Sequence, residues 1–132
     1  MNQENHITEL AGCLIFREGK LFLLYREDES HWEVPGGKVE KSESPTQAAV
    51  RETKEEAGVE VELKKPFYSG EFQKDGEMFL WHGYIAEVKQ GEPCTSEDRF
   101  TDSDWFGAEE LDEEDIAQNL EMVEPALRKV LD

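Results

Sequence analysis

The chain has 132 residues, and its 14 Lys and Arg against 32 Asp and Glu give a formal net charge of -18 at pH 7. Such an acidic surface repels nucleic acid polymers and anionic membranes, so we expect neither as a partner. The length suits one domain, residues 1–132, that can bury a sizeable core.

The two cysteines do not suggest a metal site or a disulfide, and the first residues do not resemble a targeting segment. Cys13 lies in an apolar run and Cys94 in a polar loop, which is the spacing of neither a zinc site nor a disulfide framework. No apolar run reaches the length of a membrane span or a signal segment. We therefore expect a cytoplasmic protein, monomeric or homodimeric, with residues 1–6 frayed.

The first part of the chain predicts a hairpin that leads into a glycine turn. Residues 10–16 read as a buried strand, 17–20 as a turn and 21–25 as a second strand. A loop at 26–30 follows. Residues 32–34 then enter the turn at the paired glycines.

The segment after that turn has the start and stop signals of a short helix. Ser44 and Gln47 form a capping-box pair, and Pro45 stands at the first helical position. Gly58 supplies the left-handed residue that ends a helix. The sequence therefore predicts a helix from Pro45 to Ala57.

The predicted helix carries an acidic face. Glu52, Glu55 and Glu56 fall within an arc of about 100°, and like charges at i,i+4 destabilise a helix by about 0.2–0.5 kcal/mol per pair. A hard divalent cation removes this repulsion, because Mg²⁺ and Mn²⁺ prefer carboxylate oxygens. The alternative is a solvated acidic face in an acid-rich chain. The opposite face is expected to pack inward through Thr46, Ala49, Val50, Thr53 and Ala57.

The middle of the chain predicts further strands. Residues 59–63 alternate with the period of a half-buried strand, and 64–66 are expected to break it before extended structure resumes at 67–72. A turn at 74–77 precedes a long strand at 78–88.

The last part predicts a polar loop at 90–104, of a length that is often functional, then a short strand at 105–106. A helical turn is expected at 109–111 and a helix at 115–131. The helix would bury the apolar stripe Ile116, Leu120, Val123, Leu127 and Val130. Strands on both sides of a central helix indicate an α/β protein whose mixed β-sheet lies between helices.

The segment 37–59 resembles the signature of the Nudix hydrolases. Gly37 and Glu43 precede the run Arg51-Glu52-x-x-Glu55-Glu56-x-Gly58-Val59 at the family's spacing. Thr53 departs from the aliphatic residue usual in the family, a change that concerns packing. Residues 34–40 are similar to the lead-in of MutT-type members. This resemblance implies a Nudix-type α/β/α sandwich.

The resemblance also implies roles for the residues of this segment. Glu52, Glu55 and Glu56 would bind Mg²⁺, with Mn²⁺ as an alternative, and the backbone carbonyl of Gly36 is a further candidate ligand. Arg51 and Glu43 would form an ion pair that fixes the loop against the helix.

The implied chemistry is attack of water on a diphosphate bridge, which needs a general base. Glu52 is one candidate. Glu97 is the other, since residues 91–97 resemble the MutT-type loop that brings a further glutamate to the metal or the water. The alternative for Glu97 is one more acid in an acidic loop.

Substrate contacts are less specified. Arg26 lies where MutT-type proteins have a base-contacting arginine, and Gly37 lets backbone approach an anion closely. Lys38 is either a phosphate contact or an exposed lysine. Val123 stands before Glu124-Pro125 where sanitising members have an asparagine, which argues against oxidised-guanine recognition. Asn119 is the nearest asparagine.

The function expected from this resemblance is a Mg²⁺-dependent pyrophosphohydrolase that cleaves a nucleoside triphosphate to a nucleoside monophosphate. The partner would be this small-molecule nucleotide. One alternative is an ADP-ribose or nucleotide-sugar pyrophosphatase, although residues 73–76 lack the proline that ADP-ribose hydrolases carry beyond the signature. Another is a non-catalytic nucleotide-sensing domain.

Overall fold

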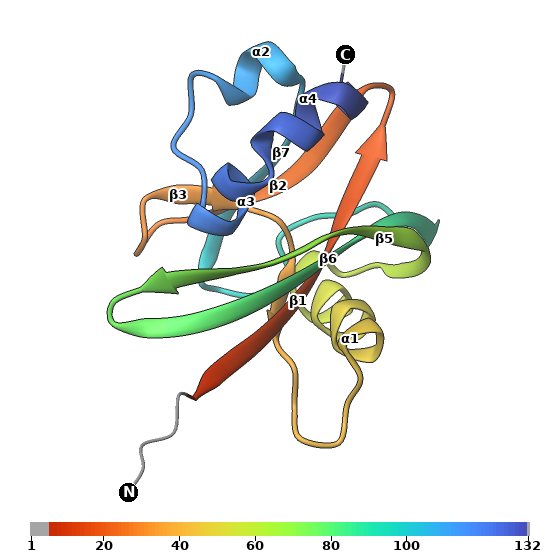
Figure 1. Ribbon diagram of the computed structural model, residues 1–132. Coiled ribbons are helices and arrows are strands. Elements are labelled where there is room, and N and C mark those ends of the chain that lie inside the picture. The colour runs from red at the N-terminus through yellow and green to blue at the C-terminus, as the bar shows by residue number, and fades with distance from the viewer. Residues whose placement is uncertain (1–5, 132) are drawn as a thin grey trace, which may run out of the picture.

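A computed structural model describes residues 6–131, so the expectation of frayed residues at 1–6 lies outside the described residues for all but His6. The strands are β1 (Ile7–Arg17), β2 (Lys20–Arg26), β3 (His31–Glu33), β4 (Gly36–Lys38), β5 (Glu60–Lys74), β6 (Glu77–Gln90) and β7 (Phe100–Phe106). The helices are α1 (Pro45–Ala57), α2 (Ala108–Leu111), α3 (Gln118–Met122) and α4 (Glu124–Leu131). Their arrangement is shown in Figure 1.

The strands form a mixed sheet. Its order within residues 6–131 is β3-β2-β1-β6-β5, with β4 paired to β1 and β7 paired to β2. β1 and β6 run parallel from Ile7↔Met78 to Ile15↔Ala86, and the other pairs are antiparallel. The predicted hairpin of β1 and β2 and the predicted mixed sheet are both confirmed.

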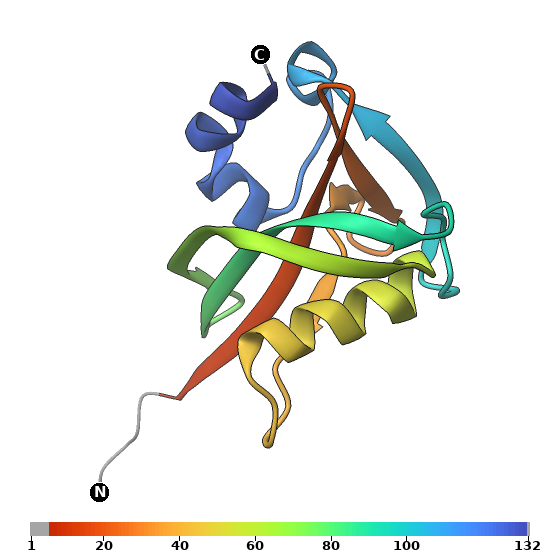
Figure 2. The same cartoon turned by 90° about the vertical axis from the view of Figure 1, so that its right-hand side faces the viewer.

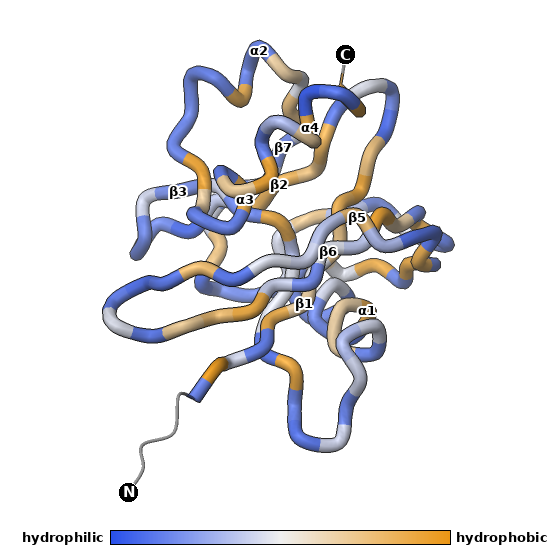
Figure 3. Tube along the Cα trace, viewed as in Figure 1, coloured by the Kyte–Doolittle hydropathy of each residue, from blue (hydrophilic) through white to orange (hydrophobic). Residues whose placement is uncertain are grey.

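Two hydrophobic cores lie on opposite faces of the sheet. Cys13 and Phe22 pack toward the alanines of α1, whereas their neighbours Leu14 and Leu23 pack with Leu120 and the other apolar residues of α2 to α4. This alternation follows from the period of two in a strand. Figure 2 shows α1 on one side of the sheet and α3 with α4 on the other. Figure 3 shows hydrophobic residues along β1 and β2 and hydrophilic ones at the β5–β6 turn. The predicted α/β/α sandwich is confirmed.

Helix α1 has the predicted bounds and both predicted caps. Ser44 Oγ accepts from the Gln47 N–H at 3.2 Å, Gln47 Oε1 accepts from the Ser44 N–H at 2.9 Å, and Gly58 has φ 72°. The expectation for Thr46 was wrong, because Thr46 is exposed and Ala48 is buried instead. With no side chain beyond Cβ, Ala48 lets α1 lie close to the sheet.

The predicted break at 64–66 is also wrong. β5 continues through Pro66, and its pairing with β6 shifts register between Leu63 and Lys65 and between Pro66 and Tyr68. β5 is an edge strand, where a proline can be tolerated, and the bulges absorb the missing N–H.

The C-terminal part differs from the expectation in several ways. The strand β7 begins at Phe100, so the irregular loop is shorter than predicted. The predicted helix at 115–131 begins only at Gln118, since Ile116 pairs with Trp32 in a β-bridge. It is also divided at Val123, because Pro125 has no N–H to continue the helical ladder. Leu131 is buried in place of Val130, which is 42% exposed. None of the helices within residues 6–131 has the length and apolarity needed to cross a membrane.

Candidate active site

A cavity of ≈ 340 Å³ opens where the ends of several strands meet the start of α3. Its walls come from β1 to β6, the loop before β7 and α3. The lining residues are Leu10, Arg26, His31, Glu33, Val34, Gly36, Gly37, Lys38, Phe72, Lys74, Phe79, Trp81, Arg99, Ala117, Gln118 and Asn119.

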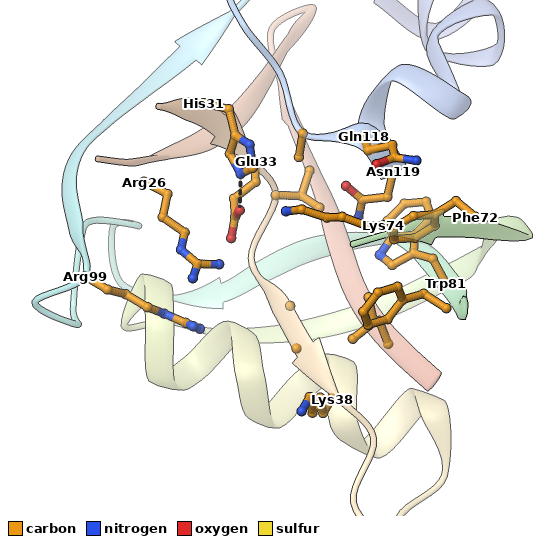
Figure 4. Close-up of a pocket in the computed structure, with 16 residues that line it drawn as sticks. Arg26, His31, Glu33, Lys38, Phe72, Lys74, Trp81, Arg99, Gln118 and Asn119 are labelled. Carbon is orange, nitrogen blue, oxygen red and sulfur yellow. Dashed lines mark hydrogen bonds and ion pairs between the residues drawn. The ribbon is translucent and has the colours of Figure 1, made fainter. Parts of the chain in front are cut away.

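The cleft has two chemically distinct sides (Figure 4). Arg26 and Arg99 lie on one side in this view, and Phe72 and Trp81 lie on the other beside the amides of α3. Lys38 and Lys74 also line the cleft, so four Lys and Arg side chains line it in all: Arg26, Lys38, Lys74 and Arg99. The lining acid Glu33 is bonded to His31 at 2.7 Å. On a protein of net charge -18, this gathering of cations favours an anionic ligand.

Glu56 is fully buried and contacts two residues that line the cleft, Gly36 and Arg99. Its Oε1 accepts from the Gly36 N–H at 2.9 Å, and its Oε2 pairs with the guanidinium of Arg99. Burial raises the pKa of Glu56 to about 8, even though the Gly36 hydrogen bond and Arg99 act in the opposite direction. Burial thus favours the protonated acid, while the two donors favour the carboxylate and would hold it out of water.

Glu52 and Glu55 share Arg51. The Nη1 of Arg51 lies 3.1 Å from Glu52 Oε2 and 3.3 Å from Glu55 Oε2. Glu52 is mostly buried, and burial raises its pKa, whereas Glu55 is exposed. The repulsion expected between these neighbouring carboxylates is thus offset by one guanidinium between them.

The expected ion pair of Arg51 and Glu43 is present. It is bidentate, with Nε to Oε2 at 2.6 Å and Nη2 to Oε1 at 3.0 Å, a geometry that arginine and carboxylate form well. Arg51 also donates to the carbonyl of Lys38 at 3.1 Å. The hydrogen bonds from Arg51 and from the Glu40 N–H lower the pKa of Glu43 to about 2. The loop before α1 is therefore tied to the middle of the helix.

The donor chemistry fits a hard divalent cation. Glu52, Glu55 and Glu56 lie on adjacent turns of α1 and offer only carboxylate oxygens, which Mg²⁺ and Mn²⁺ prefer over softer metals. Within residues 6–131, no three His, Cys, Asp or Glu side chains already converge as a metal site. The three carboxylates are instead turned toward Arg51 and Arg99, so metal binding requires side-chain rotation.

The paired glycines make room for these carboxylates. A Cβ at Gly37 would lie 2.5 Å from the carboxyl carbon of Glu52, and a Cβ at Gly36 would lie 2.5 Å from the backbone oxygen of Ala11. The sequence indicated that these glycines let backbone approach an anion. The anionic groups beside them in the structure are the protein's own Glu52 and Glu56.

The two glycines therefore give different outcomes on substitution. Gly37→Ala is expected to lower kcat by about tenfold or more, because the new methyl displaces the Glu52 carboxylate and rate falls steeply with such a displacement. Its Tm should change little, since the Glu52 side chain can turn aside. Gly36→Ala is expected to destabilise the fold by about 1–3 kcal/mol, because the new methyl meets backbone. Steady-state kinetics and thermal unfolding of both variants test this. An unchanged kcat for Gly37→Ala would contradict it.

The other residues singled out from the sequence are only partly brought together. Arg26, Gly37 and Lys38 line the cleft, and Arg26 is bonded to Asp28 at 3.0 Å. Glu97 is absent from the lining and lies 3.3 Å from Arg99 Nε.

Sequence reasoning missed Arg99, which lines the cleft and touches both Glu56 and Glu97. A signal for it exists, because Arg99 is the single basic residue in the acidic segment 90–104. It also missed Lys74 and the His31–Glu33 pair, for which the sequence holds no comparable signal.

Comparison with known families accounts for this combination of fold and acidic helix. The family model of the NUDIX domain matches residues 8–130. The chain belongs to the Nudix hydrolase family. The glutamates of α1 and the cationic cleft thus lie within a Nudix domain.

Three relatives differ in how much of each chain the similarity covers. A MutT-like protein of Streptomyces ambofaciens is 38% identical over 58 residues, which are 44% of this chain and 38% of the relative. The CTP pyrophosphohydrolase of Escherichia coli is 36% identical over 82 residues, 59% of this chain and 61% of that protein. The 8-oxo-dGTP diphosphatase of Escherichia coli is 29% identical over 125 residues, 91% of this chain and 95% of that protein.

A solved structure extends the similarity to the whole fold. The MutT Nudix hydrolase of Burkholderia pseudomallei superposes with a TM-score of 0.85 at 27% identity, covering 95% of this chain and 98% of that one. The Nudix fold deduced from the signature is therefore shared over nearly all of the chain.

Proposed function

We propose that this Nudix hydrolase is a Mg²⁺-dependent pyrophosphohydrolase that converts a nucleoside triphosphate to a nucleoside monophosphate and pyrophosphate. The observation that carries the proposal is that carboxylates of α1 contact residues that line a cationic cleft. Glu56 and Arg99 contact one another, and Arg99 and Gly37 line the same cleft. A pure nucleotide sensor has no need of such a carboxylate cluster.

Glu52, Glu55 and Glu56 are the proposed metal ligands, with the carbonyl of Gly36 as a further donor. When bound, the metal would neutralise charge on the phosphates and lower the pKa of its water. Glu52 is the proposed base, because its mostly buried carboxylate faces the glycine turn. Glu97 is the alternative base or an additional ligand.

The remaining charged groups have supporting roles in the proposal. Arg51 and Glu43 hold the loop and helix in register through their bidentate pair. Arg26 and Lys38 line the cleft where they can hold phosphate oxygens. These cations offset the repulsion that an anionic substrate meets from the rest of the protein.

The far side of the cleft suits a nucleobase. Phe72 and Phe79 are partly exposed, stack on each other with ring centroids 5.3 Å apart, and offer aromatic surface to a base. The amides of Gln118 and Asn119 offer both donors and acceptors. The sequence argument against oxidised-guanine recognition is weakened, since Asn119 lines the cleft despite its distance from Glu124. Two relatives, named for CTP and for 8-oxo-dGTP, support a nucleoside triphosphate over a nucleotide sugar.

The test is hydrolysis of a panel of nucleoside triphosphates and nucleotide sugars in oxygen-18 water, with mass analysis of both products. We expect monophosphate and pyrophosphate, with one solvent oxygen in one of the two products. This outcome follows because the cluster lies near the cleft where the internal phosphates would be held, away from the aromatic side.

Each other outcome of this hydrolysis test would indicate a different function. Nucleoside diphosphate with orthophosphate as first products would show a phosphatase and contradict the proposal. Cleavage of ADP-ribose alone would favour the nucleotide-sugar alternative. Binding of nucleotides without turnover, at saturating Mg²⁺, would favour the sensor.

A further inference from the structure

Arg99 connects the loop before β7 with the buried end of α1. Its Nη2 donates to Oε2 of Glu56, its Nε lies 3.3 Å from Glu97, and its guanidinium lies 5.0 Å from the ring centroid of Phe100. The Glu56 side chain is 0% exposed, whereas that of Arg99 is 42% exposed. The pair therefore joins a fully buried glutamate to an arginine that is partly exposed to the cleft.

The backbone around Arg99 is fixed to α1. The N–H of Ser96 donates to the carbonyl of Glu56 at 2.9 Å, and the N–H of Cys94 donates to the carbonyl of Ala57 at 3.0 Å. These are among the last carbonyls of α1, which have no partner within the helix. Because the loop is fastened in this way, a change at Arg99 is a rotation of its side chain with the loop in place.

Glu56 has one oxygen available for exchange. Its Oε1 is held by the Gly36 N–H, so the guanidinium and a divalent cation compete for Oε2. Both cations at one oxygen would repel each other at close range. A buried carboxylate without any partner is strongly destabilising, so Glu56 needs one of the two cations in order to stay ionised.

We propose that Arg99 is an exchangeable counter-ion: it holds Glu56 until a divalent metal takes that carboxylate, and then turns into the cleft to bind a phosphate of the substrate. The cleft is within reach, because Arg99 lines it beside Arg26 (Figure 4). Phosphate binding then becomes coupled to metal binding, because the metal releases the guanidinium that the phosphate binds. The phosphate half of this inference rests on the proposed function, and the exchange at Glu56 does not.

Thermal unfolding of Arg99→Gln with EDTA and with saturating Mg²⁺ tests the exchange. In EDTA, Tm should fall by about 5–10 °C, because Glu56 loses its counter-ion. In Mg²⁺ the variant and the original protein should agree within about 2 °C, since the metal then partners Glu56. Arg99→Lys keeps the charge and should show the same dependence on Mg²⁺ with a smaller fall. If Arg99→Gln does not fold in EDTA, the Tm comparison is made with Arg99→Lys instead.

Arg26→Gln is the matched control. It removes the same charge from the same cleft, but the partner of Arg26 is the exposed Asp28. Its effect on Tm should be small and equal in the two buffers. A second control is the Glu56→Gln background, in which Arg99→Gln should have little effect in EDTA because no buried charge is left unpaired.

An equal fall in Tm for Arg99→Gln in both buffers would overturn the exchange, since Arg99 would then remain on Glu56 with metal bound. The phosphate half is tested by kinetics in Mg²⁺, where Arg99→Gln should raise KM about tenfold and change kcat less. An unchanged KM would overturn that half. If no nucleotide is hydrolysed, the proposed function fails while the thermal comparison still decides the exchange.

Discussion

Glu52→Gln is expected to lower kcat by about 10³-fold, the largest loss for a single change in this chain. The variant removes the group proposed to be both a metal ligand and the base, and the amide keeps the size of the side chain that fits against Gly37. Steady-state kinetics at saturating Mg²⁺ measures the loss. Circular dichroism and Tm establish that the variant is folded.

Two further variants give this result its meaning. Glu40→Gln removes the same charge from an exposed side chain 3.9 Å from Arg51 and should leave kcat within about twofold, as expected of a screened surface pair. Glu97→Gln should lower kcat by about tenfold or less, because Glu97 pairs with Arg99, whereas Glu52 lies beside the glycine turn. Equal losses for Glu52→Gln and Glu97→Gln would move the base to the loop and leave Glu52 as a ligand only.

Removal of divalent metal with EDTA is expected to reduce hydrolysis to the uncatalysed background, and added Mg²⁺ should restore it. Glu55→Gln should lower kcat by about 10²–10³-fold at saturating Mg²⁺, because a ligand that stabilises charge in the transition state is lost. Glu55 is exposed and contacts only Arg51 among its ion pairs, so its replacement tests the metal with little disturbance of the fold.

The stability of Glu55→Gln in EDTA supplies an independent check. If the three carboxylates only repelled one another, removing one charge would make the variant more stable. Arg51, however, already offsets the repulsion between Glu52 and Glu55. We therefore expect the free energy of unfolding to change by less than about 0.5 kcal/mol. Near-native turnover of Glu55→Gln would contradict the assignment of the acidic face to metal binding.

The parts of the fold that could be predicted are those whose signals are local. Helix α1 has its cap at Ser44, its proline at Pro45 and its stop at Gly58, all within the segment itself, and its bounds match the prediction. The path of β5 through Pro66 was missed because its bulges depend on pairing with β6. The alternation of apolar and polar residues within β5 holds no information on how β6 pairs with it.

The same distinction applies to the candidate site. The pair of Arg51 and Glu43 lies within one signature and was predicted, whereas Arg99 meets Glu56 from 43 residues away. That contact depends on a loop whose backbone caps the end of α1, a geometry that charge patterns along the chain do not reveal. The burial of Glu56 could not be read from the helix either, because Glu55 and Glu56 are adjacent acids with opposite exposure.

The two sides of the cleft are carried by different parts of the chain. The carboxylates belong to α1, while the partly exposed Phe72 and Phe79 belong to β5 and β6, and Asn119 belongs to α3. Mutations that reshape the aromatic and amide side therefore need not disturb the reacting groups. A change of nucleotide preference can arise through substitutions in these strands and in α3 without first losing turnover, which makes this side the natural target for libraries that alter selectivity.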